Sequence, residues 1–339
     1  MNTTDLAIGI LGASRIAPKS IIEPARELGH TIMMVAARNP ERAREFASVH
    51  AIPVVALDYA ALIADPRVQV VYNALPNALH GPWNARALES GKAVISEKPF
   101  ASNADEAAHI FQLAARTGGR IVEAFHYAFH PAMARVRSAL EASELGTVRH
   151  VEASLDIPRP TATDPRLSGR LAGGALMDVG CYGLHAQQTV ARWMGDTLAI
   201  VGARGRPDPQ DAGVDASFEV DLEFGSGASG AVRCSMEGAR ERLQLTIIGS
   251  SATLTVHNFV LPHSDDRVSV RSSAGVVVEH VGRTSSYTHQ LAAFAPYLAG
   301  RDDIPPVHPE ESLAIMRMID EGLLAAGWKP RKHISTKPI

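Results

Sequence analysis

The chemistry available to this 339-residue chain starts with a lysine held between an acid and a proline, in the run Glu97-Lys98-Pro99. Pro99 has a fixed φ and also restricts the backbone of Lys98, so the ammonium group is held in place. The run follows a short apolar segment that is predicted to form a strand. If that strand is parallel to its neighbours, Lys98 lies at the carboxyl end of a sheet, where ligands bind in such folds. A surface turn or a structural ion pair would explain the run equally well.

A second run, near the middle of the chain, carries an acid, a phenol and an imidazole at Asp178, Tyr182 and His185. If the run is helical, this spacing places the three side chains on one face, where they could hold a polyol or sugar and move a proton. Gly180 and Gly183 each cost about 1 kcal/mol of helix propensity, which indicates that something approaches the backbone closely. The alternative, a polar stripe facing solvent, fits poorly with the apolar residues around it.

A loop between the first predicted strand and the first predicted helix points to a nucleotide. Aligned to the dinucleotide fingerprint G-x-G-x-x-G/A, it offers Gly12, Ser14 and Ala17, so the middle glycine is missing. A serine there could still donate its hydroxyl and its N–H to a pyrophosphate at the helix N-terminus. Taken alone the match is weak, and an ordinary strand-to-helix turn is the alternative.

The end of the second predicted strand indicates which dinucleotide would bind. NAD sites usually carry an acid there for the ribose hydroxyls, whereas NADP sites tend to carry an arginine for the 2′-phosphate. This strand ends at Arg38-Asn39 with no acid. We therefore predict NADP as the cofactor, with NAD possible, and place Arg38 on the 2′-phosphate. The alternative is a solvated arginine.

Strands and helices that alternate over the first third of the chain would position these loops. Continuous apolar strands separated by helices form a parallel sheet covered on both faces. We predict an α/β fold whose first domain, residues 1–123, is a Rossmann doubly wound parallel sheet that binds NAD(P). The predicted strands are 6–11, 31–36, 68–74, 93–96 and 120–124, and the predicted helices are 18–28, 40–49, 59–63, 82–89 and 103–117.

The pattern changes after residue 123. From 198 to 281 apolar residues alternate with polar ones, as in antiparallel strands with one buried face. We predict a substrate-binding and oligomerisation α+β domain over 124–339 with a large, mainly antiparallel sheet. Its polar face would be exposed or covered by a partner subunit. The other predicted elements are a strand at 148–155 and helices at 131–143, 176–194, 287–299 and 309–326.

Composition excludes several classes of function. The 33 basic and 36 acidic residues nearly balance, which argues against a nucleic-acid partner. No apolar run approaches the ~20 residues of a membrane span. Two cysteines, Cys181 and Cys234, cannot form a disulfide framework or a cysteine zinc site and fit a reducing cytosol, so a cytoplasmic protein is expected. His126 and His130 lack the accompanying ligands of a metal site, and none is predicted.

Several motifs in chain order resemble those of the Gfo/Idh/MocA oxidoreductases, the family of glucose–fructose oxidoreductase and inositol dehydrogenase. The form Asp-Val-Gly-x-Tyr is most similar to the branch with glucose–fructose oxidoreductase, xylose dehydrogenases and dihydrodiol dehydrogenases. The resemblance implies an NAD(P)-dependent oxidoreductase that transfers a hydride between the cofactor and the carbinol or carbonyl of a sugar, polyol or cyclic diol. The matching motifs are Gly9-Ile-Leu-Gly12…Arg15-Ile-Ala17, Asn73-Ala-Leu-Pro76-Asn77…His80, Gly91-Lys-Ala-Val…Glu97-Lys98-Pro99, Glu123-Ala-Phe…Tyr127…Phe129-His130-Pro131 and the run 173–182.

The resemblance also implies roles for individual residues. Lys98 would lie beside the nicotinamide and the reacting carbon, and Tyr182 would transfer the proton. Asp178 would orient Lys98 or the substrate, and His185 is a further catalytic candidate. A nearby ammonium would lower the pKa of Tyr182 from the ordinary value of about 10. The expected cofactor contacts are Gly12, Ala13, Ser14, Arg15, Ile16, Arg38, Asn73, Leu75, Pro76, His80, Glu97 and Lys98, and the expected substrate contacts are His126, Tyr127, His130 and Arg159.

Two residues depart from the family's pattern, and two alternative functions remain. His126 and Ala128 differ from the family's usual Met-Tyr-Arg-Phe-His-Pro pattern, which affects the expected substrate contacts and not the fold. The alternatives are a glycoside hydrolase that uses NAD for a transient oxidation and a cofactor-binding regulator without turnover. The joint presence of Lys98, Asp178 and Tyr182 argues against the regulator. The resemblance further implies a homodimer or homotetramer.

Overall fold

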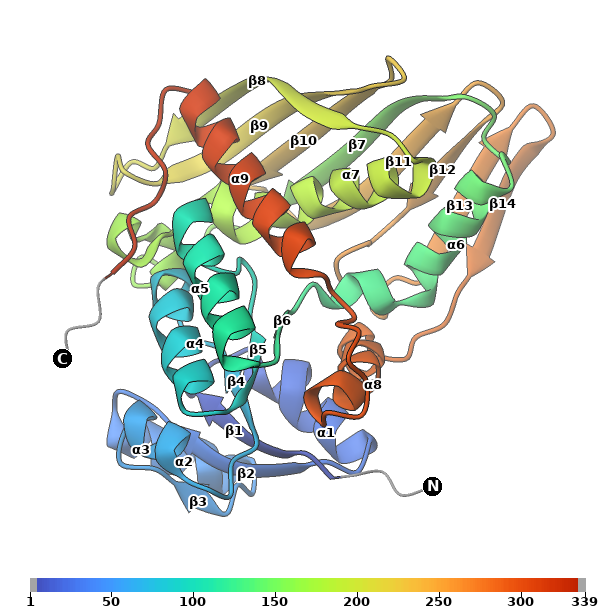
Figure 1. The fold of residues 1–339 in the computed structure, drawn as a ribbon. Helices are drawn as coiled ribbons and strands as arrows, with labels where there is room; N and C mark the ends of the chain where they lie inside the picture. The colour runs from blue at the N-terminus through green and yellow to red at the C-terminus, as the bar shows by residue number, and fades with distance from the viewer. Residues whose placement is uncertain (1–4, 335–339) are drawn as a thin grey trace. The chain divides into compact units, whose positions relative to one another are not determined.

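A computed structural model describes residues 5–334, which fold into two compact units (Figure 1). Unit 1 contains the chain up to Phe125, the later segment Tyr287–Leu313 and residues 333–334. Unit 2 contains His126–Ser286 and Ala314–Lys332. The domain boundary after residue 123 stays a prediction.

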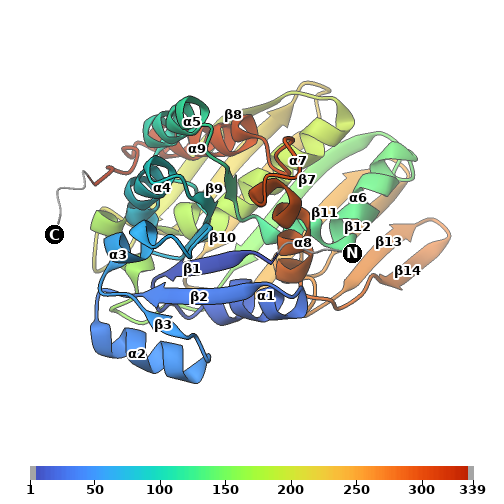
Figure 2. The same ribbon diagram turned by 60° about the horizontal axis from the view of Figure 1, so that its bottom comes forward.

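Unit 1 is built on a parallel sheet with the strand order β3-β2-β1-β4-β5-β6, part of which faces the reader in Figure 2. The order reverses between β1 and β4, and ligands bind at such a point, beyond the carboxyl ends of the strands. The predicted doubly wound fold is confirmed. The strands are β1 Ala7–Leu11, β2 Thr31–Ala36, β3 Val54–Val55, β4 Val70–Asn73, β5 Ala93–Ser96 and β6 Ile121–Glu123. The helices are α1 Glu23–Glu27, α2 Pro40–Val49, α3 Tyr59–Ala64, α4 His80–Glu89, α5 Ala104–Thr117 and α8 Ser286–Leu298.

Local sequence explains most of these elements. Asn39 and Asn103 cap α2 and α5, because each amide oxygen accepts a backbone N–H of the first turn. All four residues of β4 are buried, as expected for a strand covered on both faces. The sequence pattern missed β3, since two residues carry no periodicity. This strand is defined by its pairing with β2, where Met34 lies opposite Val54.

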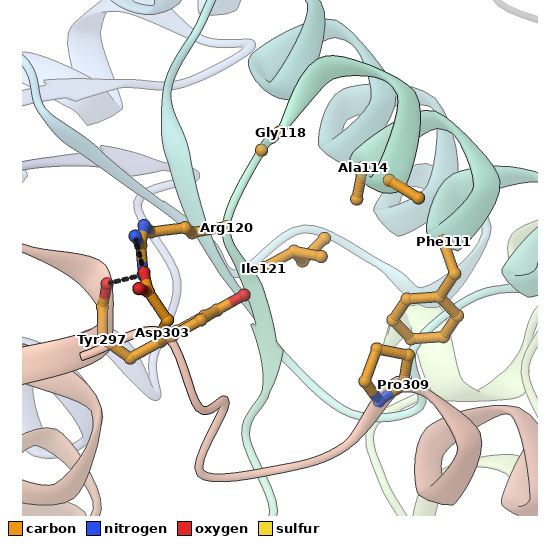
Figure 3. Close-up of a pocket in the computed structure, with 10 residues that line it drawn as sticks. Phe111, Ala114, Gly118, Arg120, Ile121, Tyr297, Asp303 and Pro309 are labelled. Carbon is orange, nitrogen blue, oxygen red and sulfur yellow. Dashed lines mark hydrogen bonds and ion pairs between the residues drawn. The ribbon is translucent and has the colours of Figure 1, made fainter. Parts of the chain in front are cut away.

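A pocket of about 300 Å³ in unit 1 lies at the amino end of β6 (Figure 3). Arg120 forms one wall, where it donates to the Tyr297 carbonyl at 3.0 Å and pairs with Asp303 at 2.8 Å. Phe111 and Pro309 form another part of the lining. Because β6 ends at Glu123, the pocket lies at the opposite end of this strand from the edge where a nucleotide would bind.

Unit 2 contains a sheet with the strand order β14-β13-β12-β11-β7-β10-β9-β8 (Figure 1). β7 and β10 pair in parallel and the other neighbours pair antiparallel, so the predicted, mainly antiparallel sheet is confirmed. The strands are β7 Val148–Asp156, β8 Leu198–Pro207, β9 Asp215–Phe224, β10 Ser229–Ser235, β11 Arg242–Gly249, β12 Ala252–Val256, β13 Arg267–Ser272 and β14 Gly275–His280. The helices are α6 Pro131–Glu141, α7 Cys181–Met194 and most of α9, Pro309–Ala325.

The glycines before and within α7 allow the helix to pack closely on the sheet. A Cβ atom at Gly183 would lie 2.6 Å from Val232 Cγ1 and 2.9 Å from Leu155 Cδ1. A Cβ atom at Gly180 would lie 2.9 Å from Cys234 Sγ. The backbone at Gly180 and Gly183 is therefore approached closely by side chains of the sheet. The close approach inferred from the sequence is present, and buried side chains of β7 and β10 make it.

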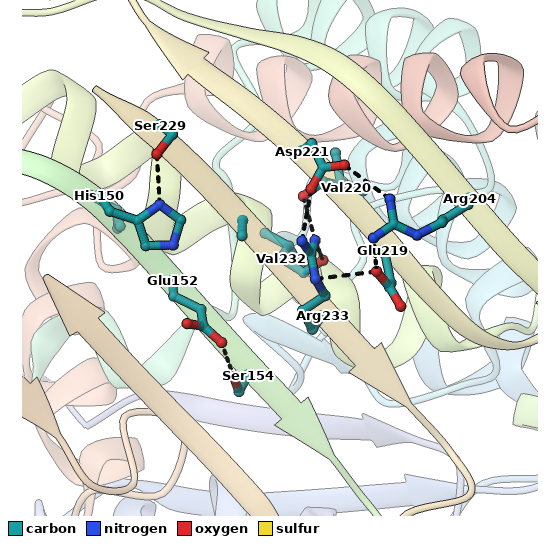
Figure 4. Close-up of polar contacts among 12 residues, drawn as sticks. His150, Glu152, Ser154, Arg204, Glu219, Val220, Asp221, Ser229, Val232 and Arg233 are labelled. Atoms are coloured by element: carbon teal, nitrogen blue, oxygen red, sulfur yellow. Dashed lines mark hydrogen bonds and ion pairs between the residues drawn. The ribbon is translucent and has the colours of Figure 1, made fainter. Parts of the chain in front are cut away.

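The other face of this sheet carries polar side chains, which Figure 4 shows. The stripe of Glu219 and Asp221 on β9 is neutralised from both sides. Arg204 of β8 pairs with both carboxylates, and Arg233 of β10 lies 3.2 Å from Glu219 and 2.8 Å from Asp221. These two acidic residues are thus part of a balanced network of ion pairs.

None of the helices between residues 5 and 334 has the length and apolar character that crossing a lipid bilayer requires.

Candidate active site

The loop after β1 has a glycine, and so a backbone without a side chain, at the carboxyl edge of the sheet in unit 1. Gly12 has φ +98°, and its N–H donates to the Ala36 carbonyl at 2.8 Å. A side chain at this position would meet Leu75 Cδ2 at 3.1 Å. Ser14 accepts the N–H of Ala17 at 3.3 Å, so its hydroxyl organises the helix start. This arrangement suits a pyrophosphate, which needs close approach to backbone N–H groups.

Two arginines lie beside this loop. Arg38 is exposed just after β2, and its N–H donates to the Tyr59 hydroxyl at 3.2 Å. Arg42, one turn further on α2, donates to the Ala13 carbonyl at 2.9 Å. Burial raises the pKa of Tyr59, and the positive charges of both arginines oppose that shift. Sequence reasoning missed Arg42. The available signal was its place in the first turn of the predicted helix 40–49, four residues after Arg38.

A chain of buried amides links the ends of β4 and β5. Asn73 donates to the Asn84 side-chain oxygen at 2.8 Å, and Asn84 donates to the Ser96 hydroxyl at 2.8 Å. All three side chains are fully buried. The side chain of Asn73 therefore holds the strand ends together, and its contact with a cofactor stays a prediction.

His80 ties the loop after β4 to the loop that carries Lys98. Its two ring nitrogens each lie 2.7 Å from a carbonyl oxygen, one of Leu75 and one of Pro99. Burial lowers the pKa of His80 to about 4, and the two carbonyls oppose the shift. A neutral ring has one N–H and therefore donates to only one of these two carbonyls, while its position between them bridges the two loops. The expected contact of His80 with a cofactor stays a prediction.

Glu97 and Lys98 point to different surroundings within unit 1. The Tyr72 hydroxyl donates to Glu97 Oε1 at 2.6 Å. It also lies 2.6 Å from Ser20 Oγ in the π-helical turn Pro18–Ile22, which precedes α1. Lys98 is half-buried, and its positive charge lowers the pKa of His80 and of Glu123. Glu97 therefore accepts a hydrogen bond inside unit 1, and the expected contacts of Glu97 and Lys98 with a cofactor stay predictions.

Glu123 at the end of β6 is a buried acid whose role sequence reasoning missed. Only 1% of the residue is exposed. Burial raises the pKa of its carboxyl to about 8, and the Ser312 hydroxyl, the Phe100 N–H and the Lys98 charge oppose this shift. At neutral pH the carboxyl is mostly protonated and uncharged. The available signal was its place in the motif Glu123-Ala-Phe.

Unit 2 gathers two tyrosines and two histidines around the start of α7. Tyr182 Oη lies 3.3 Å from His126 Nε2, and Tyr127 Oη lies 2.6 Å from His185 Nδ1. The ring of Tyr127 stands edge-on to both Tyr182 and His185, with centroids 5.9 and 5.5 Å away. Tyr182 and His185 therefore join one cluster, as expected. His126 and Tyr127, predicted substrate contacts, form its buried side.

The environment of His185 keeps it neutral. Burial lowers its pKa to about 3, and the charge of Arg192 acts in the same direction. Burial also raises the pKa of Tyr127 well above its ordinary value. Tyr127 therefore keeps its proton, and its hydroxyl shares a hydrogen bond with His185 Nδ1 in which the donor depends on the tautomer of the ring. An imidazole with so low a pKa is a weak base at neutral pH.

Asp178 lies in a different setting from Tyr182. The segment Leu176–Gly180 is a π-helical turn, so the helical spacing assumed for Asp178 does not hold there. Asp178 lies 3.5 Å from Arg166, which is itself held by Asp164 at 2.9 Å. Its orienting role stays a prediction.

His130 and Arg159, also expected near the substrate, are engaged inside unit 2. His130 is buried and caps α6, because its Nδ1 accepts the N–H of Ala132 at 3.1 Å. Arg159 pairs with Asp208 at 2.7 Å and with Glu237 at 3.0 Å. Substrate contact by either side chain stays a prediction.

Two further residues lie close to His126 or to its partner. Ser286 Oγ lies 2.8 Å from His126 Nδ1 and 3.1 Å from His263 Nδ1. Sequence reasoning missed both residues, and no local pattern could have found them, since they are distant in sequence from His126. Within the described residues, no group of three or more His, Cys, Asp or Glu side chains is arranged to hold a metal ion.

Two family models match the chain. One, described as an oxidoreductase family with an NAD-binding Rossmann fold, matches residues 6–125, and the GFO/IDH/MocA C-terminal domain matches residues 133–255. D-xylose 1-dehydrogenase (NADP(+)) 2 of Haloferax volcanii is 34% identical over 319 residues, covering 93% of this chain and 95% of the relative. Trans-1,2-dihydrobenzene-1,2-diol dehydrogenase of Xenopus laevis is 27% identical over 340 residues, covering 94% of this chain and 97% of the relative.

A solved structure shows the same similarity over both units. A 3-ketoreductase from Actinomadura kijaniata in complex with NADP and TDP-benzene has a TM-score of 0.87 at 25% identity, covering 95% of this chain and 98% of that chain. Structures of the same enzyme with a tyrosine replaced by phenylalanine and with a lysine replaced by glutamate have TM-scores of 0.87 and 0.84, each at 25% identity.

Proposed function

Because the chain belongs to the Gfo/Idh/MocA oxidoreductase family, we propose that it is an NADP-dependent enzyme acting on the carbinol or carbonyl of a sugar, polyol or cyclic diol. The observation that carries the choice of cofactor is the pair Arg38 and Arg42 beside the bare loop at Gly12. Relatives named for D-xylose, a dihydrodiol and a 3-keto group support the class of substrate.

The residues of unit 1 fit the proposed cofactor. The backbone at Gly12 and the following helix start would hold the pyrophosphate, since anions are favoured there. Arg38 and Arg42 would hold the 2′-phosphate, because a guanidinium binds phosphate oxygens through paired hydrogen bonds. Leu75, which lies against Gly12, would line the same loop. When bound, the nicotinamide supplies the group that accepts or returns the hydride.

Lys98 and Tyr182 are the proposed catalytic pair. The lysine and the tyrosine replaced in the ketoreductase structures are separated by the same number of residues as Lys98 and Tyr182 are here. An ammonium group favours the negative charge that develops on the reacting oxygen, and a phenol can give or take the proton. We assign the first role to Lys98 and the second to Tyr182.

Tyr182 is a better proton-transfer group than His185. Burial lowers the pKa of His185 to about 3, and its Nδ1 is already engaged by the hydroxyl of Tyr127 at 2.6 Å. Tyr182 instead lies beside His126, whose second nitrogen continues to Ser286. The tyrosine therefore has a path for its proton, and the role of His185 is to hold Tyr127 in place.

A panel of substrates tests the proposal. D-xylose, D-glucose, myo-inositol and trans-1,2-cyclohexanediol would each be incubated with NADP⁺ and with NAD⁺, and nicotinamide reduction would be followed by absorbance. We expect reduction of NADP⁺ with at least one of them and a higher kcat/KM for NADP⁺ than for NAD⁺. Release of sugar from a glycoside without net reduction would support the hydrolase instead. Preference for NAD⁺ would contradict the assignment of Arg38 and Arg42.

We also propose that a second copy of the chain covers the polar face of the sheet in unit 2. The carboxylates of Glu219 and Asp221 are already balanced by Arg204 and Arg233 on this face (Figure 4). Light scattering coupled to size exclusion would show a dimer or tetramer, and a monomer would contradict the proposal.

A further inference from the structure

Tyr182 stands at one end of a chain of hydrogen-bonding groups that leads to a partly exposed histidine. Tyr182 Oη lies 3.3 Å from His126 Nε2, His126 Nδ1 lies 2.8 Å from Ser286 Oγ, and Ser286 Oγ lies 3.1 Å from His263 Nδ1. His126 and Ser286 are 1% and 0% exposed, whereas His263 is partly exposed. We propose that these four residues form a proton relay between the substrate and solvent. The inference rests on the proposed role of Tyr182.

A single backbone group sets the direction of the relay. The N–H of Ser286 donates to His263 Nδ1 at 3.4 Å. Because an N–H can only donate, His263 Nδ1 carries a lone pair, and the Ser286 hydroxyl donates to it as well. Ser286 Oγ then accepts from His126 Nδ1–H, which leaves His126 Nε2 as an acceptor. The hydroxyl of Tyr182 therefore donates to His126, and every bond of the relay points from Tyr182 toward His263.

This direction solves a difficulty of tyrosine as a base. A free tyrosine has a pKa near 10 and rarely exists as phenolate at neutral pH, whereas the ordinary pKa of histidine is about 6.5. In the relay Tyr182 need not become a phenolate, because it passes its own proton on as it takes up the proton of the substrate. The final base is His263.

The proton transfers balance along the relay. Oxidation of one carbinol gives a hydride to the nicotinamide cofactor and a proton to Tyr182 Oη. The original proton of Tyr182 moves to His126 Nε2, the Nδ1 proton of His126 moves to Ser286 Oγ, and the hydroxyl proton of Ser286 moves to His263 Nδ1. His263 becomes an imidazolium and releases one proton to solvent. Reduction of a ketone runs through the same transfers in reverse.

Two other titratable groups beside Tyr182, Tyr127 and His185, are held in their neutral forms. Tyr127 stands edge-on to Tyr182 and is hydrogen-bonded to His185. Burial keeps Tyr127 protonated and His185 neutral.

The tautomers of the two histidines test the relay without any substrate. Long-range ¹H–¹⁵N spectra of the full chain with labelled histidine would be recorded, with His126→Met and His263→Asn used to assign the signals. We expect the proton of His126 on Nδ1 and that of His263 on Nε2. In Ser286→Ala we expect His126 to lose its fixed tautomer. A wild-type His126 with its proton on Nε2, or one that Ser286→Ala leaves unchanged, would overturn the relay whether or not the proposed function holds.

Kinetics with D-xylose and NADP⁺ as probes supply the second test. Ser286→Ala and His263→Asn should each lower kcat about 10²-fold, the lower end of what proton transfer contributes, and raise the solvent isotope effect. Added imidazole buffer should restore part of the lost rate in both. The control is His257→Asn, which breaks a similar bond between His257 and Ser269 (3.0 Å) outside the relay and should change neither quantity.

Unchanged kcat and solvent isotope effect in both relay variants would overturn the relay. If the wild-type enzyme does not oxidise D-xylose, that substrate of the proposed function fails, and the tautomer spectra still decide the relay.

Discussion

The polar networks of the two units are built from groups with different chemistry. In unit 1 the network that joins β4 to β5 is centred on two amides, with Asn84 between Asn73 and the Ser96 hydroxyl. An amide donates through nitrogen and accepts through oxygen, so its bonds fix positions. In unit 2 the groups beyond Tyr182 are imidazoles and hydroxyls. A hydroxyl donates and accepts through one oxygen, and an imidazole can take up a proton at one nitrogen and release one from the other. The first network holds the ends of two strands together, and the second can move a proton.

Removal of the Lys98 charge from unit 1 should have a very large effect. Lys98→Ala should lower kcat about 10³-fold, because the charge that favours the reacting oxygen is lost. The Kd for NADP should stay within a few-fold of the wild-type value, since the phosphate contacts lie elsewhere in unit 1. Steady-state kinetics and a fluorescence titration with NADPH would measure both. Near-normal turnover would remove Lys98 from the catalytic pair.

The cations beside the phosphate loop should determine cofactor choice. Arg38→Ala and Arg42→Ala should each reduce the ratio of kcat/KM for NADP⁺ over NAD⁺ by about 10- to 100-fold, the range for one charge-assisted hydrogen bond. Arg44→Ala, an exposed arginine on the same helix, is the matched control and should leave the ratio unchanged. If Arg42→Ala behaves like the control, the 2′-phosphate is held by Arg38 without it.

Breaking the amide network should affect folding more than proton transfer. Asn84→Ala leaves Asn73 and Ser96 without their buried partner, which should lower the free energy of unfolding by about 1–3 kcal/mol. Urea denaturation would measure the change, with the exposed Ser48→Ala as the control expected within about 0.5 kcal/mol of wild type. A raised solvent isotope effect in Asn84→Ala would contradict the distinction between the two networks.

Glu123 is the exception in unit 1, because it binds a proton near neutral pH. Burial raises its pKa from 4.5 to about 8, so the folded state holds a proton that the unfolded state has lost. Stability should therefore fall as pH rises between these two values, by at most about 1.4 kcal/mol per pH unit. Glu123→Gln should lack this contribution.

This prediction would be tested by measuring the free energy of unfolding of wild type and of Glu123→Gln between pH 5 and pH 9 and taking the difference at each pH. The histidines with lowered pKa, His80 and His185, lose stability in the opposite sense as pH falls below about 6.5, and they are common to both proteins. The advantage of Glu123→Gln should grow with pH and level off above about pH 8. A constant difference would show that Glu123 is ionised in the folded protein.

Sequence patterns predicted the parts of this molecule that depend on neighbours in the chain. The strands of unit 1, the alternation that builds the sheet of unit 2, and the clustering of Tyr182 with His185 all follow from local periodicity. What escaped prediction depends on contacts between distant segments. Ser286 and His263 meet His126 only in the folded protein. The π-helical turn at Asp178 changes a spacing that ordinary helix geometry assumes.

The glycines of the motif that contains Tyr182 also show that a local pattern does not identify a distant contact. Gly180 and Gly183 suggested close approach to the backbone, and the structure shows that the sheet makes it. Gly174, just before the π-helical turn, has φ +130°, and a side chain there would collide with Asp215. The glycines of this motif therefore allow α7 to pack closely on the sheet. That packing also fixes the position of Tyr182, the proposed proton-transfer residue.

The proton-transfer role of Tyr182 is tested most directly by its replacement with phenylalanine, which removes one oxygen and keeps the ring. Turnover of NADP⁺ with the best substrate of the panel, and the Kd for NADPH, would be measured for wild type and Tyr182→Phe side by side. We predict that kcat falls by at least about 10²-fold while the Kd stays within a few-fold. Equal turnover by the two proteins would contradict the assignment of Tyr182 and, with it, the catalytic role of the relay.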